Sequence, residues 1–506
     1  MASRTKNAAR NIIFGTVLKI YQIIVPFIMR TAMIYFMGVE YLGLNSLFTS
    51  ILQVLSLAEL GVGTAMVFSM YKPIAEDDTD SICALMRLYK VYYRIIGAVI
   101  AILGLALTPF IPRLIQGDIP ANINLYLLYF LNLAATVASY WMFAYKNAIL
   151  QAEQRSDIFS KVGLVVSTLQ YLVQFFSLWI LKNYYIYVLV VLICQVFTNI
   201  ITAIVADKLY PQYKPYGNMT KEKVDLINKR IADLFTAQLG YVVNTSVDSV
   251  VISAFLGLTQ LAIYNNYFFI MNSVMGFILI VFNSIIAGIG NSLVLESKEK
   301  NYNDLKKLTF IIFWITNFCS CCFLCIYQSF MDIWVGRELM LTFMHVVLIT
   351  ILFYVQTTKK VWVVFKDSAG IWHEDRYRPL ITAGCNLIMN IIMVKYFELY
   401  GVMLSTILAE ILISTPWLLS NLFKYVLPVE HGRYYSSIMK YVFIAVLCAV
   451  MSVEICSKID LSKSLNIIVS LIICTVISNG MQILFYFNTA EFNESKQLVL
   501  RAINRG

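Results

Sequence analysis

The sequence predicts an all-α integral membrane protein with about 14 transmembrane helices: two parallel six-helix bundles related by a pseudo-twofold axis, plus two C-terminal helices. Three observations support this prediction. Hydrophobic residues make up 59% of the 506 residues and charged residues only 13%. Soluble domains contain about 45–50% apolar residues and about 25% charged residues. The mean hydropathy is +0.73. Long apolar segments also recur along the whole chain, and a short sequence strip recurs in its two halves.

This composition excludes a secreted disulfide scaffold, a disordered tail and a typical cytosolic enzyme. The formal net charge is +10. In a membrane protein such an excess reflects Lys and Arg in cytoplasmic loops, so we expect no nucleic-acid partner. Only three histidines are present, which argues against a His-ligated metal site. We therefore expect a protein that is embedded in the membrane and binds no cofactor.

A helix needs about 20 apolar residues to cross about 30 Å of hydrocarbon. Fourteen segments satisfy this condition to within a few residues. The weakest are 380–397, which is short, and 341–365, which contains two lysines. The full set is 12–37, 44–70, 91–111, 123–145, 162–181, 184–205, 236–257, 263–289, 309–331, 341–365, 380–397, 401–423, 438–456 and 465–487.

The distribution of basic residues predicts the orientation. With a cytoplasmic N-terminus, 27 of the 39 Lys and Arg residues fall in inward segments, six in outward loops, and six inside or at the edge of spans. Cytoplasmic loops are enriched in Lys and Arg, so we expect both termini in the cytoplasm. The outward loops are at most about a dozen residues long, too short for the catalytic domain of a membrane glycosyltransferase or polymerase. We therefore expect a protein that is not an enzyme.

An internal repeat suggests the domain organisation. The strip Gly38–Leu44 follows the first span and Gly257–Ile263 follows the seventh, and the two align on a glycine and on apolar positions. Parallel repeats around an axis normal to the membrane are a transporter architecture with the substrate site between the halves. The predicted parts are an N-terminal bundle (1–205), a basic cytoplasmic linker (206–232), a C-terminal bundle (233–423), and two further helices with a cytoplasmic tail (424–506).

Two charged residues occupy equivalent positions in the repeats. Arg30 precedes the first strip by eight residues and Asp248 precedes the second by nine, which puts both about 12–14 Å below the outer turn. An ionisable residue in a span costs about 2.5–3.5 kcal/mol or more, so each needs a reason. We expect Arg30 to bind substrate, and Asp248 to pair with it or to bind a coupling ion. The alternative is a structural ion pair between packed helices.

Five more charges fall within predicted spans. Lys19 and Glu59 lie in the inner third of spans 1 and 2, where they would pair unless Lys19 extends to the cytoplasmic interface. Lys359 and Lys360 lie in the inner part of span 10 and would attract phosphate, or reach the interface in the same way. Glu410 lies near mid-depth in span 12. We assign the lysines, Glu59 and Asp248 to substrate binding together with Arg30, and Glu59, Glu410 and Asp248 to ion coupling.

The ten cysteines imply no disulfide framework, because nine lie in or at the ends of apolar segments. Cys319, Cys321, Cys322 and Cys325 are close together in the sequence, but span 9 offers no His and no adjacent loop. We interpret them as small buried residues of a membrane helix, and expect no metal.

Two segments resemble a known family. The stretch from Arg30 to Ala75, with G-V-E-Y-L-G-L-N and E-L-G-V-G-T-A, and the stretch from Asp248 to Tyr267, with D-S-V-V-I-S-A-F-L-G-L-T-Q-L-A-I-Y-N-N-Y, resemble Wzx-type polysaccharide flippases. These belong to the multidrug/oligosaccharidyl-lipid/polysaccharide exporter (MOP) superfamily. The resemblance covers the whole chain through the span count, and is residue-specific mainly in spans 1, 2, 7 and 8.

The resemblance implies a flippase in the bacterial plasma membrane. Such a protein transfers an undecaprenyl-pyrophosphate-linked oligosaccharide repeat unit from the inner to the outer leaflet by alternating access through a cationic central cavity. An ion gradient could bias the cycle, and the sequence does not choose between a proton, a sodium ion and neither. A polysaccharide polymerase and a chain-length regulator are the candidate partners. Two alternatives remain open, a multidrug cation antiporter of the same superfamily and a lipid II flippase. The site residues rest on their depth in the spans.

Overall fold

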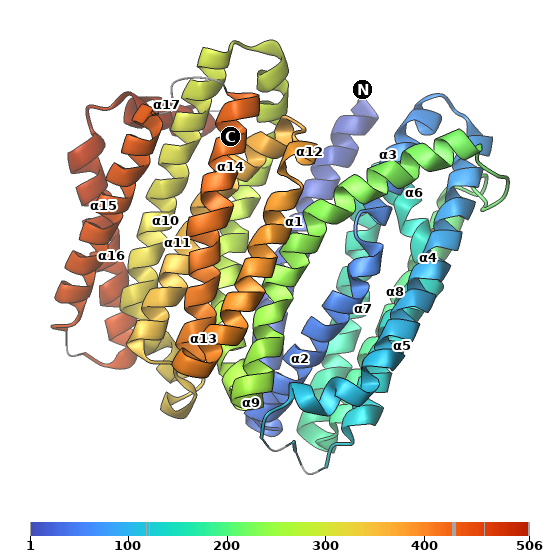
Figure 1. Cartoon of the computed structure of the whole chain (residues 1–506), viewed down its shortest axis with the longest axis horizontal. Helices are drawn as coiled ribbons and strands as arrows, with labels where there is room; N and C mark the ends of the chain where they lie inside the picture. The colour runs from blue at the N-terminus through green and yellow to red at the C-terminus, as the bar shows by residue number, and fades with distance from the viewer. Residues whose placement is uncertain (1, 118, 121, 428–431, 460, 504–506) are drawn as a thin grey trace. The chain divides into compact units, whose positions relative to one another are not determined.

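The computed structural model describes residues 2–117, 119–120, 122–427, 432–459 and 461–503, and the elements in these ranges are all helical (Figure 1). The chain forms two compact units, Met1–Asn265 and Asn266–Gly506. The division into bundles around a linker at 206–232 remains a prediction.

The first unit is built from long helices that pack side by side. Helix α1 packs against α7, α5 packs against both α4 and α8, and α7 packs against α8. The N-terminal part of α9 belongs to this unit as well. The helices are α1 (Ala2–Phe36), α2 (Val39–Leu55), η1 (Ser56–Glu59), α3 (Val62–Ala75), α4 (Thr79–Leu107), η2 (Thr108–Leu114), α5 (Leu125–Trp141), η3 (Ala144–Lys146), α6 (Asn147–Ala152), α7 (Ser156–Phe176), η4 (Ser177–Leu181), α8 (Tyr184–Leu209) and α9 (Lys221–Leu295).

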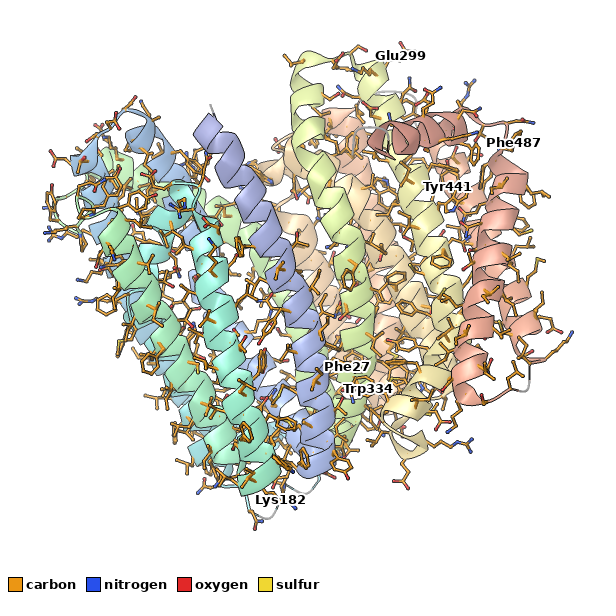
Figure 2. The ribbon with its side chains drawn as sticks, turned by 180° about the vertical axis from the view of Figure 1, so that it is seen from behind. Phe27, Lys182, Glu299, Trp334, Tyr441 and Phe487 are labelled. Atoms are coloured by element: carbon orange, nitrogen blue, oxygen red, sulfur yellow. The ribbon has the colours of Figure 1, made fainter. Side chains whose placement is uncertain are left out.

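The second unit begins within α9. Helix α10 packs against α11, α15 and α16, and α15 and α16 lie side by side (Figure 1). Glu299 and Trp334 lie near opposite ends of α10 (Figure 2). The remaining helices are α10 (Lys298–Trp334), η5 (Arg337–Leu339), α11 (Phe343–Ser368), α12 (Trp372–Asp375), α13 (Tyr377–Ala409), η6 (Glu410–Ser414), α14 (Thr415–Asn421), η7 (Leu422–Val426), α15 (Gly432–Cys456), α16 (Lys463–Tyr486) and α17 (Ala490–Ile503).

Ten described helices are long and apolar enough to cross a membrane, or eleven if one bent pair counts as a span. This is fewer than the fourteen predicted, for structural reasons. Helix α9 runs through two predicted spans, as does the continuous helical stretch Trp372–Val426. The predicted span 44–70 is divided by η1 into α2 and α3, each shorter than a membrane crossing. The chain is a multi-pass membrane protein.

Helix α9 changes direction at Gly257, whose φ of 88° lies in the left-handed region. Such a φ costs glycine nothing and other residues about 1 kcal/mol or more. A Cβ at this position would also lie 2.8 Å from the carbonyl oxygen of Gln116. The backbone N–H of Gln116 donates to the carbonyl of Ser253 at 2.9 Å, so the loop satisfies an acceptor freed by the break.

Many large apolar side chains are exposed on the outer faces of the helices, among them Ile102, Val476 and Leu484 at 65%, 66% and 73%. Small polar residues lie inside instead, including Ser253 and Ser405, which are fully buried. This arrangement suits a protein whose solvent is lipid. In such a protein, apolar side chains face the hydrocarbon, and small and polar side chains pack between the helices.

Gly43 allows α2 to approach α9 in the first unit. A Cβ built on Gly43 would lie 2.1 Å from the carbonyl oxygen of Leu258, whereas a Cβ on Gly384 in α13 meets no atom within 4 Å. We expect Gly43→Ala to destabilise the protein by about 1–3 kcal/mol through overpacking, and Gly384→Ala to leave stability unchanged or slightly raised. Thermal unfolding of the purified variants in detergent measures both. Equal melting temperatures for Gly43→Ala and wild type would contradict the close approach.

Charged side chains inside the two units: the candidate functional site

An ion pair lies inside the second unit, between α11 and the π-helical turn η6. The ammonium group of Lys359 donates to the carboxylate of Glu410, and also to the hydroxyl of Ser414 at 3.2 Å. Glu410 is only 4% exposed. Its partner comes from α11, a pairing that the sequence analysis did not foresee.

A second ion pair joins the first through Ser414. The guanidinium of Arg378 donates to both carboxylate oxygens of Asp375, at 2.8 and 2.7 Å, and to the Ser414 hydroxyl at 2.9 Å. Lys366 lies 3.4 Å from Asp375, and the Asn421 amide donates to the same carboxylate at 3.0 Å. We call this set the α11–η6 charge cluster; its members are Lys359, Lys366, Asp375, Arg378, Glu410, Ser414 and Asn421.

Local backbone structure brings the cluster together. Helix α12 is one turn long and sets Asp375 three residues before Arg378 at the start of α13. A π-helical turn begins at Glu410, and such turns occur frequently at functional sites. Lys360 is half-buried beside the cluster, within electrostatic range of Lys359 and Glu410. With Lys360 included, four cations face two buried carboxylates and the half-exposed carboxylate of Asp367, an excess of one positive charge.

Glu59 lies in the first unit at the end of the 3₁₀ turn η1. Tyr93 and Tyr140 each donate a hydroxyl hydrogen bond of 2.7 Å, one to each oxygen of its carboxylate. Tyr89 donates to the Tyr93 hydroxyl at 2.6 Å. The predicted pairing with Lys19 is not formed: the Lys19 side chain is exposed on α1, and no ion pair joins it to Glu59 within the described residues. Phenol groups therefore take the place of the expected ammonium.

Arg30 and Asp248 also lie inside the first unit. The Arg30 side chain is partly buried on α1, within electrostatic range of Tyr187 of α8. Asp248 is 5% exposed and accepts a hydrogen bond of 3.2 Å from the hydroxyl of Tyr264. Tyr264 belongs to the part of α9 beyond the break at Gly257, so this bond spans the break. The pairing of Arg30 with Asp248 and their roles remain predictions.

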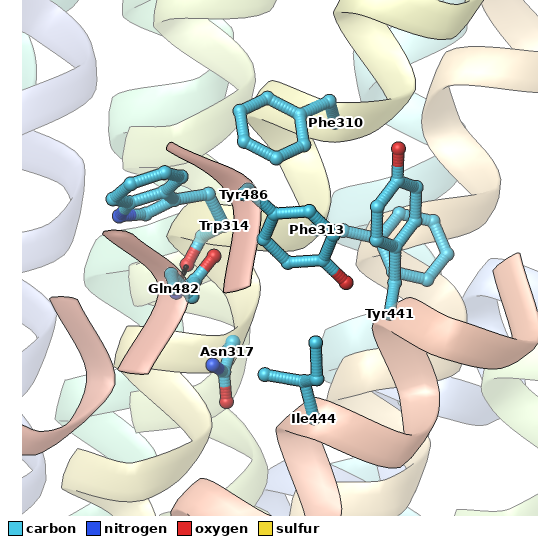
Figure 3. Close-up of a pocket in the computed structure, with 8 residues that line it drawn as sticks. All are labelled: Phe310, Phe313, Trp314, Asn317, Tyr441, Ile444, Gln482 and Tyr486. Carbon is cyan, nitrogen blue, oxygen red and sulfur yellow. Dashed lines mark hydrogen bonds between the residues drawn. The ribbon is translucent and has the colours of Figure 1, made fainter. Parts of the chain in front are cut away.

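A small aromatic pocket lies between α10, α15 and α16 in the second unit (Figure 3). Aromatic side chains dominate its lining, and the amides of Asn317 and Gln482 are its polar groups. The predicted site residues do not line it. Its lining residues are Phe310, Phe313, Trp314, Asn317, Tyr441, Ile444, Gln482 and Tyr486.

The sequence analysis missed the tyrosines around Glu59 and three charged members of the charge cluster. Tyr93 and Tyr140 fall within the predicted spans 91–111 and 123–145 without any assigned role, and Lys366, Asp375 and Arg378 fall in the inward loop between the predicted spans 341–365 and 380–397. One usable signal was present: the stretch 366–378 mixes acidic and basic residues, where a loop that only sets orientation needs Lys and Arg alone.

No protein-family model matches the chain, and no curated protein matches it. Solved structures do. The inward closed lipid II flippase MurJ has a TM-score of 0.61 at 14% identity and covers 94% of this chain and 99% of its own. An inward-facing multidrug resistance MATE family transporter of the MOP superfamily has a TM-score of 0.64 at 14% sequence identity. The match covers 81% of this chain and 97% of the transporter. A point mutant of the Vibrio cholerae MATE transporter VcmN has a TM-score of 0.54 at 11% sequence identity, and the match covers 84% of this chain and 99% of VcmN.

The chain therefore has the fold of the MOP-superfamily transporters. The solved proteins that share this fold are transporters, among them a lipid II flippase and multidrug transporters.

The Lys359–Glu410 pair allows a test of the buried cluster. Glu410→Gln leaves the Lys359 ammonium buried without its counter-charge, which we expect to cost about 3–5 kcal/mol. Replacing both partners, Lys359→Met with Glu410→Met, removes both charges and should recover much of that loss. Thermal unfolding in detergent provides the measurement.

The exposed pair between Glu454 and Lys458, with side chains 65% and 71% exposed, supplies the matched control. Glu454→Gln should change stability by about 0–1 kcal/mol. A loss for Glu410→Gln no larger than for Glu454→Gln would rule out the buried pair as a structural element.

Proposed function

We propose that the protein is a flippase that moves an undecaprenyl-pyrophosphate-linked oligosaccharide repeat unit from the cytoplasmic to the outer leaflet of the bacterial plasma membrane. The observation that carries the proposal is the match in length to a lipid-linked substrate flippase. MurJ covers 94% of this chain, whereas the MATE structures above cover 81% and 84%. The fraction of this chain that the MATE structures leave unmatched corresponds to a length similar to that of the predicted C-terminal part, 424–506.

The physical chemistry of the substrate supports the same proposal. A pyrophosphate with several sugars cannot enter hydrocarbon, because each hydroxyl and both phosphates would lose water. A transporter must offer the headgroup polar and cationic groups while the prenyl tail stays in lipid. Arg30 suits this task because its planar guanidinium can hold two phosphate oxygens. The positive excess of the α11–η6 charge cluster and Lys360 likewise favours an anionic headgroup over a cation.

The proposed cycle is alternating access through a cationic cavity. Moving one charge across the membrane is worth about 2.3 kcal/mol per 100 mV, so a bound proton or sodium ion could bias the cycle. Asp248, Glu59 and Glu410 are the candidate carboxylates. The proposal also includes cytoplasmic termini, and a polymerase and a chain-length regulator as partners in surface-polysaccharide assembly.

A multidrug cation antiporter is the second candidate, and the TM-score of 0.64 to a MATE transporter favours it. Such a protein must hold an organic cation. Arg30 and the excess of cations around Lys359 would repel one, and for this reason we prefer an anionic headgroup. A lipid II flippase differs from the proposed protein only in its substrate.

Deleting the gene separates the three functions. We expect surface polysaccharide to disappear and its lipid-linked repeat unit to accumulate on the cytoplasmic face, because the headgroup cannot cross unaided. Lipid extraction with mass spectrometry identifies the accumulated species. Accumulated lipid II with loss of viability would assign a lipid II flippase, and increased sensitivity to cationic drugs with normal polymer would assign an antiporter. Either result would overturn the proposal.

Variants of the predicted site residues test the mechanism. We expect Arg30→Ala and Asp248→Ala to abolish surface polymer while the protein remains in the membrane, because the first removes the phosphate contact and the second the coupling carboxylate. Lys360→Ala should have a milder effect, since neighbouring cations remain. Polymer is measured by immunoblotting alongside membrane protein level and drug sensitivity.

Arg94 provides the matched control for these variants, because its side chain is exposed on α4. Arg94→Ala should leave polymer at the wild-type level. Normal polymer in both the Arg30 and the Asp248 variant would remove these residues from the site, and a complete loss in Lys360→Ala would mean that its role is larger than proposed.

A further inference from the structure

Three helices of the second unit bring their cysteines to one point. The sulfur atoms of Cys325 in α10, Cys456 in α15 and Cys474 in α16 all lie within 4.8 Å of one another. Cys474 is fully buried, and Cys456 is 9% exposed. Helices α10, α15 and α16 pack pairwise against each other (Figure 1), so the three sulfurs close a triangle between α10 and two consecutive helices that are far from it in sequence.

A fourth cysteine adjoins this triangle. Cys322 precedes Cys325 by three residues, which puts both on one face of α10, and Cys474 is in side-chain contact with Cys322, Cys325 and Cys456. The pair therefore forms a C-x-x-C element on a helix, a spacing that recurs in thiolate metal sites. The sequence analysis set aside the α10 cysteines because span 9 offers no His and no adjacent loop. The further cysteines come from α15 and α16.

We propose that Cys325, Cys456 and Cys474, with Cys322 as the fourth ligand, form a binding site for a thiophilic divalent cation of the Zn²⁺ and Cd²⁺ class. Thiolates bound at about 2.3 Å from zinc lie about 4 Å apart. The separations among Cys325, Cys456 and Cys474, all within 4.8 Å, therefore need a contraction of less than about 1 Å. Each coordinating cysteine releases its thiol proton to solvent when the metal binds. The bound ion joins the C-terminal helix pair α15–α16 to α10.

The surroundings suit such a site. Thiolates in excess of the ion's charge need hydrogen-bond donors in an apolar environment. The fully buried hydroxyl of Ser452 adjoins Cys474, so its proton can be donated to a sulfur. Ser470 adjoins Cys456, but its hydroxyl already donates to Asn466 at 3.1 Å.

Cadmium titration of the purified, reduced, full-length protein in detergent tests the proposal. We expect one Cd²⁺ per chain, detected by thiolate-to-metal charge-transfer absorption, and a metal-dependent rise in melting temperature because the ion binds only the folded state. Cys474→Ser, which removes the sulfur that contacts the other three, should weaken binding at least tenfold and abolish the melting shift. Cys385→Ser, a half-buried cysteine of α13 outside the cluster, should behave as wild type.

Several outcomes would overturn the site. The first is that the wild-type protein binds no stoichiometric Cd²⁺. The second is that Cys474→Ser binds Cd²⁺ as tightly as wild type, and the third is that Cys385→Ser loses as much affinity as Cys474→Ser. A loss of two hydrogens by mass in air, without metal uptake by the reduced protein, would assign a disulfide instead. If Cys474→Ser does not fold, the half-buried Cys325→Ser takes its place with the same expected tenfold loss.

Discussion

A charge inside a membrane protein must be compensated by the protein itself, and much of this structure follows from that requirement. Insertion of a single ionisable side chain costs about 2.5–3.5 kcal/mol or more, and water is not available to reduce the cost. The two units meet the requirement in different ways. In the second unit, Glu410 is compensated by the ammonium of Lys359. In the first, Glu59 is compensated by the hydroxyls of Tyr93 and Tyr140.

Breaks in the helices coincide with these charges. Glu59 ends a 3₁₀ turn between α2 and α3, and Glu410 begins a π-helical turn after α13. Asp248 lies before the break at Gly257 and is hydrogen-bonded to a tyrosine beyond it. Irregular backbone is tolerated at membrane depth only where protein or a polar cavity surrounds it. In transporters, broken helices accompany binding sites, which is the reason these three carboxylates are stronger candidates than a charge on a regular helix.

The sequence predicted the fold class because composition and apolar segment length follow directly from the solvent around the protein. It predicted Arg30, Asp248, Glu59, Lys359 and Glu410 as charges inside the membrane, since a charge stands out against an apolar background. It did not predict the tyrosine partners of Glu59 or the pairing of Lys359 with Glu410. Tyr93 and Tyr140 are indistinguishable in sequence from lipid-facing tyrosines, and the pairing of Lys359 with Glu410 joins residues 51 positions apart.

The span count shows a related limit. A hydropathy pattern separates two spans wherever polarity rises, but the chain can remain helical there. Only the backbone geometry at single residues distinguishes these cases: Gly257 and Glu398 each have a positive φ within an otherwise continuous helix. For glycine this geometry is readily available, whereas for Glu398 it is strained, and nothing in the hydropathy of the sequence indicates it.

The two modes of compensation have different consequences for ion coupling in the proposed cycle. Lys359 and Arg378 hold the carboxylates of the second unit in a buried cluster that already carries a positive excess, and removing the Glu410 carboxylate would leave cations unpaired there. The phenols around Glu59 are neutral, and their hydroxyls can reorient to donate or to accept. In the proposed cycle, the tyrosine environment can therefore adapt to a change of partner at Glu59, whereas the lysine environment holds α11 and η6 together.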